Sequence, residues 1–177
     1  MWKRKRTYFF ILISLLFSFV DNSHKEIEEY NAKALFIYNF TKYIDWENVE
    51  QISEFKISVY KSSPILSPLK HISLNKKVFN KKLIVSEVRG FPEFPDFQIL
   101  FIPEKTPLEA CDFIKNNTHY KNILIISENN KHFKEISCIN FLMEQNKIKF
   151  EVNLSQAEKA NLKISSQLLK LAVYIKK

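Results

Sequence analysis

The chain has 177 residues and a formal net charge of +8, with 27 lysines and arginines against 19 acidic residues. This length suits a single domain. Hydrophobic residues make up 46% of the chain, which is enough to form a core with little contribution from the two cysteines. The cations are scattered rather than gathered between stacking aromatic residues, which argues against a nucleic-acid partner.

The first twenty residues have the organisation of a secretory signal peptide. Four cations at positions 3–6 precede an apolar run from Tyr8 to Val20, which is short for a membrane-spanning helix. Their removal leaves a net charge of +4 on residues 21–177. No clean cleavage site follows Val20, so an uncleaved inner-membrane tether is the alternative. We therefore expect a periplasmic protein with a signal peptide at 1–20 and a folded domain at 26–177.

Apolar residues recur at helical spacing over residues 26–46, which predicts a first helix that closes at Trp46. The following segments alternate between strand and helix patterns. In chain order, we predict a strand at 55–60, a helix at 64–71 capped by Ser63, strands at 82–88 and 98–102, a helix at 107–116, a strand at 122–127, a weak helix at 131–135, and a hairpin of 139–143 with 148–152. The run at 122–127 is nearly continuous in apolar residues, as in a strand that is covered on both faces.

The C-terminal part predicts two helices rather than one. Ser155 and Glu158 form a capping box, Asn161 can end the first helix in a left-handed conformation, and Ser165 can cap the second. The second helix would bury a face made of Leu168, Leu171, Ala172 and Ile175. Together the elements predict an α/β fold: a three-layer sandwich whose mostly parallel sheet has an antiparallel hairpin at one edge.

No motif for catalysis or metal binding stands out. The four histidines have no recognisable metal-ligand spacing, a single glycine excludes a glycine-rich phosphate loop, and no serine lies in a nucleophile elbow. We therefore expect a non-catalytic protein without a cofactor. A hydrolase whose site the sequence does not reveal is the more distant alternative.

Cys111 and Cys138 would share an oxidising compartment after export, where a disulfide is chemically feasible. Cys111 falls on the buried side of its predicted helix, whereas Cys138 lies at the entrance to the hairpin. Such positions rarely bring two Cα atoms within about 7 Å. We expect no bond between these cysteines within one chain, although Cys138 could still pair between subunits.

Both ends of the domain contain distinctive motifs. The segment E-Y-N-A-K-A-L-F-I-Y-N-F-T-K-Y-I-D-W at 29–46 resembles the opening helix of the YfiR-like family. Three further segments are similar to the C-terminal signature of the family: I-N-F at 139–141, K-F-E-V-N-L at 149–154 and N-L-K-I-S-S-Q-L-L-K-L-A at 161–172. Asn161 stands where the family has glycine, and Cys138 stands in a region that is often rich in glycine. The resemblance spans roughly residues 29–175.

The resemblance implies an exported α/β protein that regulates rather than catalyses. The type member is a periplasmic repressor that holds an inner-membrane diguanylate cyclase inactive and is sequestered by an outer-membrane lipoprotein. It forms dimers, and its disulfides contribute to its stability; two cysteines cannot make the two bridges of that protein. Other members occur beside histidine kinases and receptors. The implied partner is therefore a membrane-bound signalling protein, with a homodimer as a further expectation.

We expect partner- or ligand-binding residues in the two matching ends of the domain. Asn39, Lys42 and Trp46 would cluster at the end of the first helix, and Glu151, Asn153 and Ser165 where the last strand meets the C-terminal helices. Core packing is the competing interpretation of Trp46, and capping is that of Asn153 and Ser165. The alternative function is a small-ligand-binding module with a pocket near the C-terminal helices.

Overall fold

The computed structural model describes residues 24–91, 95–116 and 120–177. The predicted signal peptide at 1–20 lies outside the described residues. Within the three described ranges, no helix is both long enough and apolar enough to cross a membrane.

An N-terminal helix over residues 24–40 leads into an alternation of short strands and helices. In chain order these are β1 (Ile44–Trp46), β2 (Glu54–Tyr60), α2 (Leu66–Asn75), β3 (Lys77–Val78), β4 (Lys81–Val88), β5 (Ile99–Ile102), α3 (Leu108–Asn116), β6 (Leu124–Glu128), β7 (Ile139–Glu144), β8 (Lys147–Asn153), α4 (Leu154–Lys159), β9 (Leu162–Ile164), α5 (Ser166–Leu169) and β10 (Tyr174–Lys176). Short 3-10 helices lie at Val49–Gln51 and Phe133–Glu135.

The main sheet has eight strands in the order β10-β8-β7-β6-β5-β2-β4-β3. Neighbours are parallel except for β7 with β8 and β3 with β4. The predicted hairpin of β7 and β8 is confirmed, and its turn residues Gln145 and Asn146 have positive φ angles of 51° and 61°. The hairpin lies one strand inside the edge, because β10 pairs in parallel with β8.

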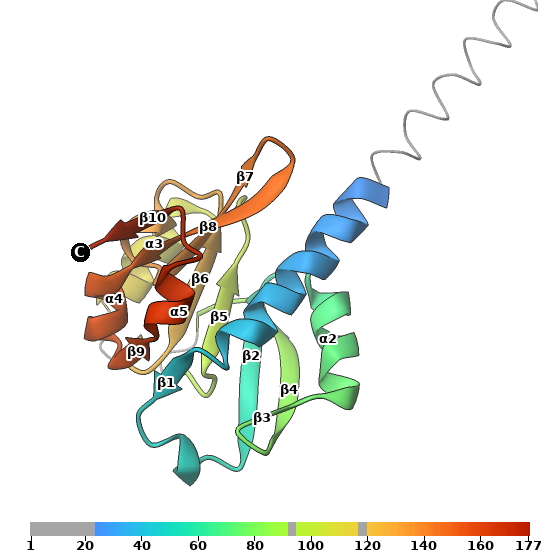
Figure 1. Cartoon of the computed structure of the whole chain (residues 1–177), viewed down its shortest axis with the longest axis vertical. Helices are drawn as coiled ribbons and strands as arrows, with labels where there is room; N and C mark the ends of the chain where they lie inside the picture. The colour runs from blue at the N-terminus through green and yellow to red at the C-terminus, as the bar shows by residue number, and fades with distance from the viewer. Residues whose placement is uncertain (1–23, 92–94, 117–119) are drawn as a thin grey trace, which may run out of the picture.

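Helices cover both faces of the main sheet, which confirms the predicted α/β sandwich. Figure 1 shows the N-terminal helix crossing in front of the sheet, between α2 and the C-terminal helices, with α3 behind. Alternate side chains of one strand enter different cores: Leu124 and Ile126 pack on the side of the N-terminal helix, whereas Ile123 and Ile125 pack with α3. The apolar run at 122–127 is therefore covered on both faces, as its pattern predicts.

A cluster of phenylalanines attaches the N-terminal helix to the sheet. Phe40 is 1% exposed, and its ring lies 5.2 Å from that of Phe150 and 5.8 Å from that of Phe141, centroid to centroid. Burying one phenylalanine side chain contributes roughly 1.5–3 kcal/mol. This packing fixes which side of the helix faces the sheet and which side faces solvent.

The N-terminal helix ends at residue 40, not at Trp46 as predicted. A turn follows, in which the Thr41 hydroxyl donates to the Tyr38 carbonyl at 2.7 Å. Ile44–Trp46 then form β1, which pairs antiparallel with β9 in a separate two-stranded sheet. The apolar pattern at 44–46 fits a helix or a strand. These residues form a strand because β9 lies beside them and provides partners for their backbone hydrogen bonds.

The predicted break between two C-terminal helices is confirmed. Asn161 has a left-handed φ of 53°, and Ser165 caps α5 by accepting a hydrogen bond from the Leu168 backbone N–H at 3.3 Å. The capping box at Ser155 is wrong. Asn153 caps α4 instead, since its Oδ1 accepts from the Gln156 backbone N–H at 3.3 Å, and the helix therefore begins earlier, at Leu154.

The second C-terminal helix is a single turn, so its predicted apolar face does not form. Leu168 is 2% exposed, but Leu171 is 64% exposed and Ile175 pairs with Val152 in β10. The helix predicted at 64–71 also begins later than expected, at Leu66 with Ile65 as its cap residue. The short strands β3, β9 and β10 carry too few residues to show a period, and their assignment depends on their partner strands.

Candidate functional site

The exposed side of the N-terminal helix and the turn after it carry two of the predicted contact residues, Asn39 and Lys42. Ile27, Asn31, Leu35, Asn39 and Lys42 follow at intervals of four and three residues and are all exposed; we call this row the outer stripe. Asn39 Oδ1 accepts a hydrogen bond from the Lys42 ammonium at 2.8 Å. Ile27 and Leu35 are 57% and 54% exposed. The outer stripe thus combines exposed apolar side chains with a polar end.

A groove of about 800 Å³ runs between the outer stripe and α2. The helix contributes Glu26, Ile27, Tyr30, Asn31 and Leu35, and the α2 side contributes Pro64, Ser67, Pro68, His71 and Ile72. Apolar side chains on both walls are available for a second chain to cover.

Trp46, the third residue of the first predicted cluster, lies in the core. It is 6% exposed, and its ring makes an edge contact with Phe55 at a centroid distance of 5.2 Å. Its indole N–H donates to the Gln98 carbonyl at 3.4 Å. These contacts correspond to the packing interpretation of Trp46, which leaves Asn39 and Lys42 as the exposed members of the cluster.

Of the second predicted cluster, Glu151 and Asn153 line one small hollow, whereas Ser165 does not. Asn153 is 6% exposed, caps α4, and donates from its backbone N–H to the Cys138 carbonyl at 2.8 Å. The Ser165 backbone N–H donates to the Tyr43 carbonyl at 2.9 Å. Ser165 is therefore joined to the residue that follows Lys42, at the end of the N-terminal helix, rather than to Asn153.

Glu151 belongs to a polar network along β6, β7 and β8. One of its carboxylate oxygens accepts from the Lys134 ammonium at 2.8 Å, and the other accepts from Asn140 Nδ2 at 3.3 Å. Asn140 Oδ1 in turn lies 2.8 Å from the Ser127 hydroxyl, which is 2.9 Å from the Ser137 hydroxyl. Since these groups satisfy one another, the network stabilises the strand ends and engages both carboxylate oxygens of Glu151.

An ionic cluster that the sequence did not reveal lies beneath the N-terminal helix. Lys33 is 2% exposed and pairs with Glu29 on its own helix and with Glu128 at the end of β6. The Tyr30 hydroxyl donates to Glu128 at 3.3 Å. Burial and the Glu128 carboxylate raise the pKa of Tyr30, so this hydroxyl stays protonated. The Glu29–Lys33 spacing is readable in the sequence, but the essential partner, Glu128, is far away along the chain.

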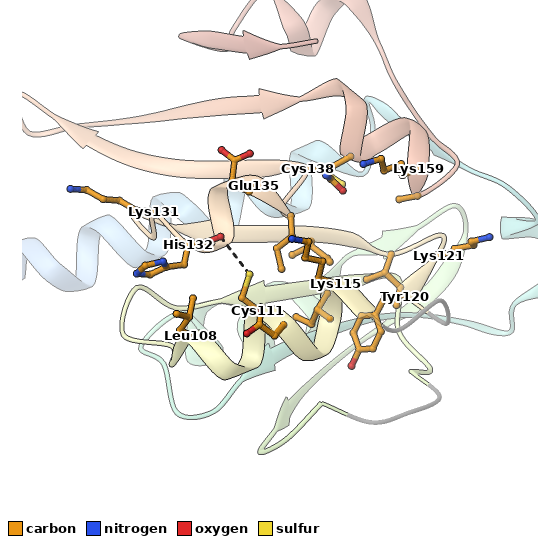
Figure 2. A pocket seen from close by; sticks show the side chains of 17 residues that line it. Leu108, Cys111, Lys115, Tyr120, Lys121, Lys131, His132, Glu135, Cys138 and Lys159 are labelled. Carbon is orange, nitrogen blue, oxygen red and sulfur yellow. Dashed lines mark hydrogen bonds between the residues drawn. The ribbon is translucent and has the colours of Figure 1, made fainter.

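A second hollow, of about 870 Å³, lies between α3, the turn at Phe133–Glu135 and α4; we call it the lysine pocket. Figure 2 shows Lys131 and Lys121 at its two ends, with Lys115 and Lys159 between them. Tyr120 also lines the pocket, and burial raises the pKa of its phenol to about 12, which keeps it neutral. The remaining lining includes Cys111, Ile114, Ile123, Ile125, Ile136 and Ala160.

Both cysteines are free and buried, in agreement with the prediction that they are not bonded to each other. Cys111 packs with α3 on one side of the sheet, whereas Cys138 belongs to the core under the N-terminal helix. Burial raises the pKa of both thiols, that of Cys138 to about 12, so neither is a reactive thiolate. Within the described ranges, no three His, Cys, Asp or Glu side chains gather as a metal ion requires.

The comparison with protein families covers most of the domain. Residues 30–173, from the N-terminal helix to the segment before β10, match the family described as YfiR/HmsC-like. A search of curated proteins found no match to the chain. The matched region contains the lysine pocket, the outer stripe except for Ile27, and the Lys33 cluster except for Glu29. The chain therefore belongs to the YfiR/HmsC-like family, which is known for a periplasmic regulator of a diguanylate cyclase.

Proposed function

We propose that this protein is an exported, non-catalytic regulator that controls a membrane-bound signalling protein by binding to it. The observation that carries the proposal is the family match over residues 30–173. Because the family is known for a regulator of a diguanylate cyclase, such a cyclase is the first partner to test, ahead of a histidine kinase or a receptor.

Export belongs to the same proposal. The basic and apolar residues at 1–20 supply the signal, and the folded domain begins shortly after them. Residues 1–30 fused to a reporter that is active only outside the cytoplasm should give a signal. A silent fusion would contradict export and, with it, periplasmic regulation.

We assign the contact surface to the outer stripe and its groove. Ile27 and Leu35 are large apolar side chains that are more than half exposed, and Asn39 and Lys42 can direct a partner through hydrogen bonds. The Lys33 cluster holds the opposite side of this helix against β6, so the stripe is presented by a fixed element. A partner that buries a preformed surface loses less conformational entropy on binding.

The test compares two exposed leucines in cells that also produce a candidate diguanylate cyclase. Leu35→Glu places a charge in the stripe, whereas Leu74→Glu changes a leucine of α2 that is 78% exposed and does not line the groove. We expect the parent protein and L74E to lower intracellular cyclic-di-GMP, and L35E to lose this effect while unfolding at the same urea concentration. Equal repression by both variants would exclude the outer stripe, and no repression by the parent protein would exclude that cyclase as the partner.

The second candidate function is a small-ligand-binding module. One observation favours it: Gln156 and Lys159 of α4 and its C-cap residue Ala160 line the lysine pocket, which places a hollow beside a C-terminal helix. Partner binding and ligand binding use separate surfaces, so the two functions are compatible and can be tested separately.

A further inference from the structure

The lysine pocket has cations at its rim that lack partners in the described parts of the chain. Lys115, Lys121, Lys131 and Lys159 are all exposed, and no ion pair forms at any of them among the described residues. They come from four separate segments: α3, the turn before β6, the turn before Phe133 and α4. The fold therefore gathers positive charge that is dispersed along the sequence.

The carboxylates at the pocket do not balance this charge. Only Asp112 and Glu135 belong to the described lining. Glu135 is already engaged by Lys176 of β10, and this ammonium lowers the pKa of the Glu135 carboxyl. The four lysines of the lining consequently outnumber its one free carboxylate, so an anion entering the pocket meets a favourable potential.

The floor between the lysines is aliphatic. Ile114, Ile123, Ile125 and Ile136 line it and are each between 3% and 8% exposed, so a small part of each side chain reaches the hollow. Cys111 also lines the pocket. Burial raises the pKa of its thiol, which therefore behaves as a small neutral group. The volume of about 870 Å³ falls within the range of small-molecule pockets, roughly 300–1,000 Å³.

We propose that the lysine pocket binds a medium-chain aliphatic carboxylate, with its acid group held by Lys115 and Lys159 and its hydrocarbon chain on the isoleucine floor. Figure 2 shows these two lysines in the central part of the pocket, whereas Lys121 and Lys131 point outward at its ends. A lysine ammonium is a flexible point charge that suits a single acid group. The aliphatic floor favours a hydrocarbon chain over a polar ligand such as a sugar. The proposal is independent of the partner bound by the outer stripe.

Three probes distinguish the contribution of the acid group to binding from that of the hydrocarbon chain. Isothermal titration calorimetry of the purified protein should detect binding of octanoate. The uncharged 1,2-octanediol should bind at least about tenfold more weakly, because it lacks a charge-assisted hydrogen bond. Acetate should show no binding, since it buries no chain. Equal affinities for octanoate and octanediol, or saturable binding of acetate, would overturn the proposal.

Variants test which lysines hold the acid group. Lys115→Gln with Lys159→Gln should weaken octanoate binding about tenfold or more and leave octanediol unchanged. Lys70→Gln is the matched control, since it removes one exposed charge from α2, away from the pocket. All of these positions are exposed, so folding is expected to be retained and is checked by circular dichroism. An unchanged octanoate affinity in the folded double variant would refute the assignment.

Isoleucine methyl NMR tests the location and the source of the ligand. Octanoate should shift the methyl signals of Ile114, Ile123, Ile125 and Ile136, and leave that of Ile57, in the opposite core, in place. Shifts confined to Ile27 and Ile72 would place the ligand in the other groove and refute the proposal. Phosphatidylglycerol vesicles present acyl chains within a lipid, and should cause no such shifts. The same shifts with vesicles, and none with octanoate, would replace the free carboxylate by a membrane lipid.

Discussion

The lysines of this protein occupy two opposite environments. Lys33 is 2% exposed, and both Glu29 and Glu128 reach its ammonium. The four lysines of the lysine pocket are exposed and form no ion pair among the described residues. Removing a charge from water costs several kcal/mol, so a buried lysine persists only with partners, whereas a solvated one needs none. Lys33 is therefore committed to the fold, and the pocket lysines remain available for a ligand.

The two environments also differ in what they connect. The Lys33 cluster joins the N-terminal helix to β6 and keeps the outer stripe facing solvent. The lysine pocket lies between α3 and α4, and its lining lysines form no ion pair within the described residues, although Glu135 pairs with Lys176. Substitutions in the first region should therefore change stability, whereas those in the second should change binding.

The largest expected effect is that of Lys33→Met. This change leaves Glu128 buried without its cation, which should lower the free energy of unfolding by about 3–5 kcal/mol. Urea denaturation followed by circular dichroism measures it. The double variant Lys33→Met with Glu128→Gln should recover part of the loss, because no uncompensated carboxylate then remains at the end of β6. A loss below about 1 kcal/mol in the single variant would mean that Glu128 is protonated or reached by water.

Removing the caps of the C-terminal helices should have a smaller effect on stability, because these substitutions involve no charged group. Asn153→Ala and Ser165→Ala should each cost about 1 kcal/mol, because each removes the acceptor of a backbone N–H. Ser155→Ala is the control, since Ser155 lies inside α4 and does not cap it. If urea unfolding showed a larger loss of unfolding free energy for S155A than for N153A, Ser155 rather than Asn153 would be the cap of α4.

The pocket lysines should contribute little to stability. Lys115→Gln and Lys159→Gln should each change the free energy of unfolding by less than about 0.5 kcal/mol, as is usual for surface positions. The contrast with Lys33→Met, measured in the same urea series, tests the comparison directly. A loss near that of Lys33→Met would show that these lysines have structural partners.

The smallest effect concerns Glu135, which Lys176 holds by a hydrogen bond at the mouth of the pocket. That bond lowers the pKa of the Glu135 carboxyl below its ordinary 4.5. A lowered carboxyl pKa stabilises the folded state above about pH 4.5, and this contribution is lost as the pH falls through the lowered value. Lys176→Gln should return the pKa towards 4.5 in an NMR titration of Glu135, and Lys177→Gln should not. An unchanged pKa in K176Q would rule out Lys176 as the cause.

The sequence by itself determined the features that depend on neighbouring residues or on one period. The alternation of strands and helices, the hairpin at 139–152, the left-handed Asn161 and the Ser165 cap are local in this sense, and the structure has all of them. The family followed from the resemblance of the two ends of the domain to known motifs, and the match over 30–173 supports it. Of the predicted contact residues, Asn39 lies on the exposed side that the helical period defines, and Lys42 is exposed in the turn that follows the helix.

Only the tertiary structure decided the features that join distant segments. Ile44–Trp46 became a strand because β9 supplied a partner, which a helical pattern through Trp46 could not foresee. Glu128 lies 95 positions from Lys33, and no spacing rule links them. The lysine pocket likewise takes its cations from four segments that no sequence pattern connects. Pairing and burial are interactions between parts of a folded chain, so a pattern read along one segment contains the residues but not their partners.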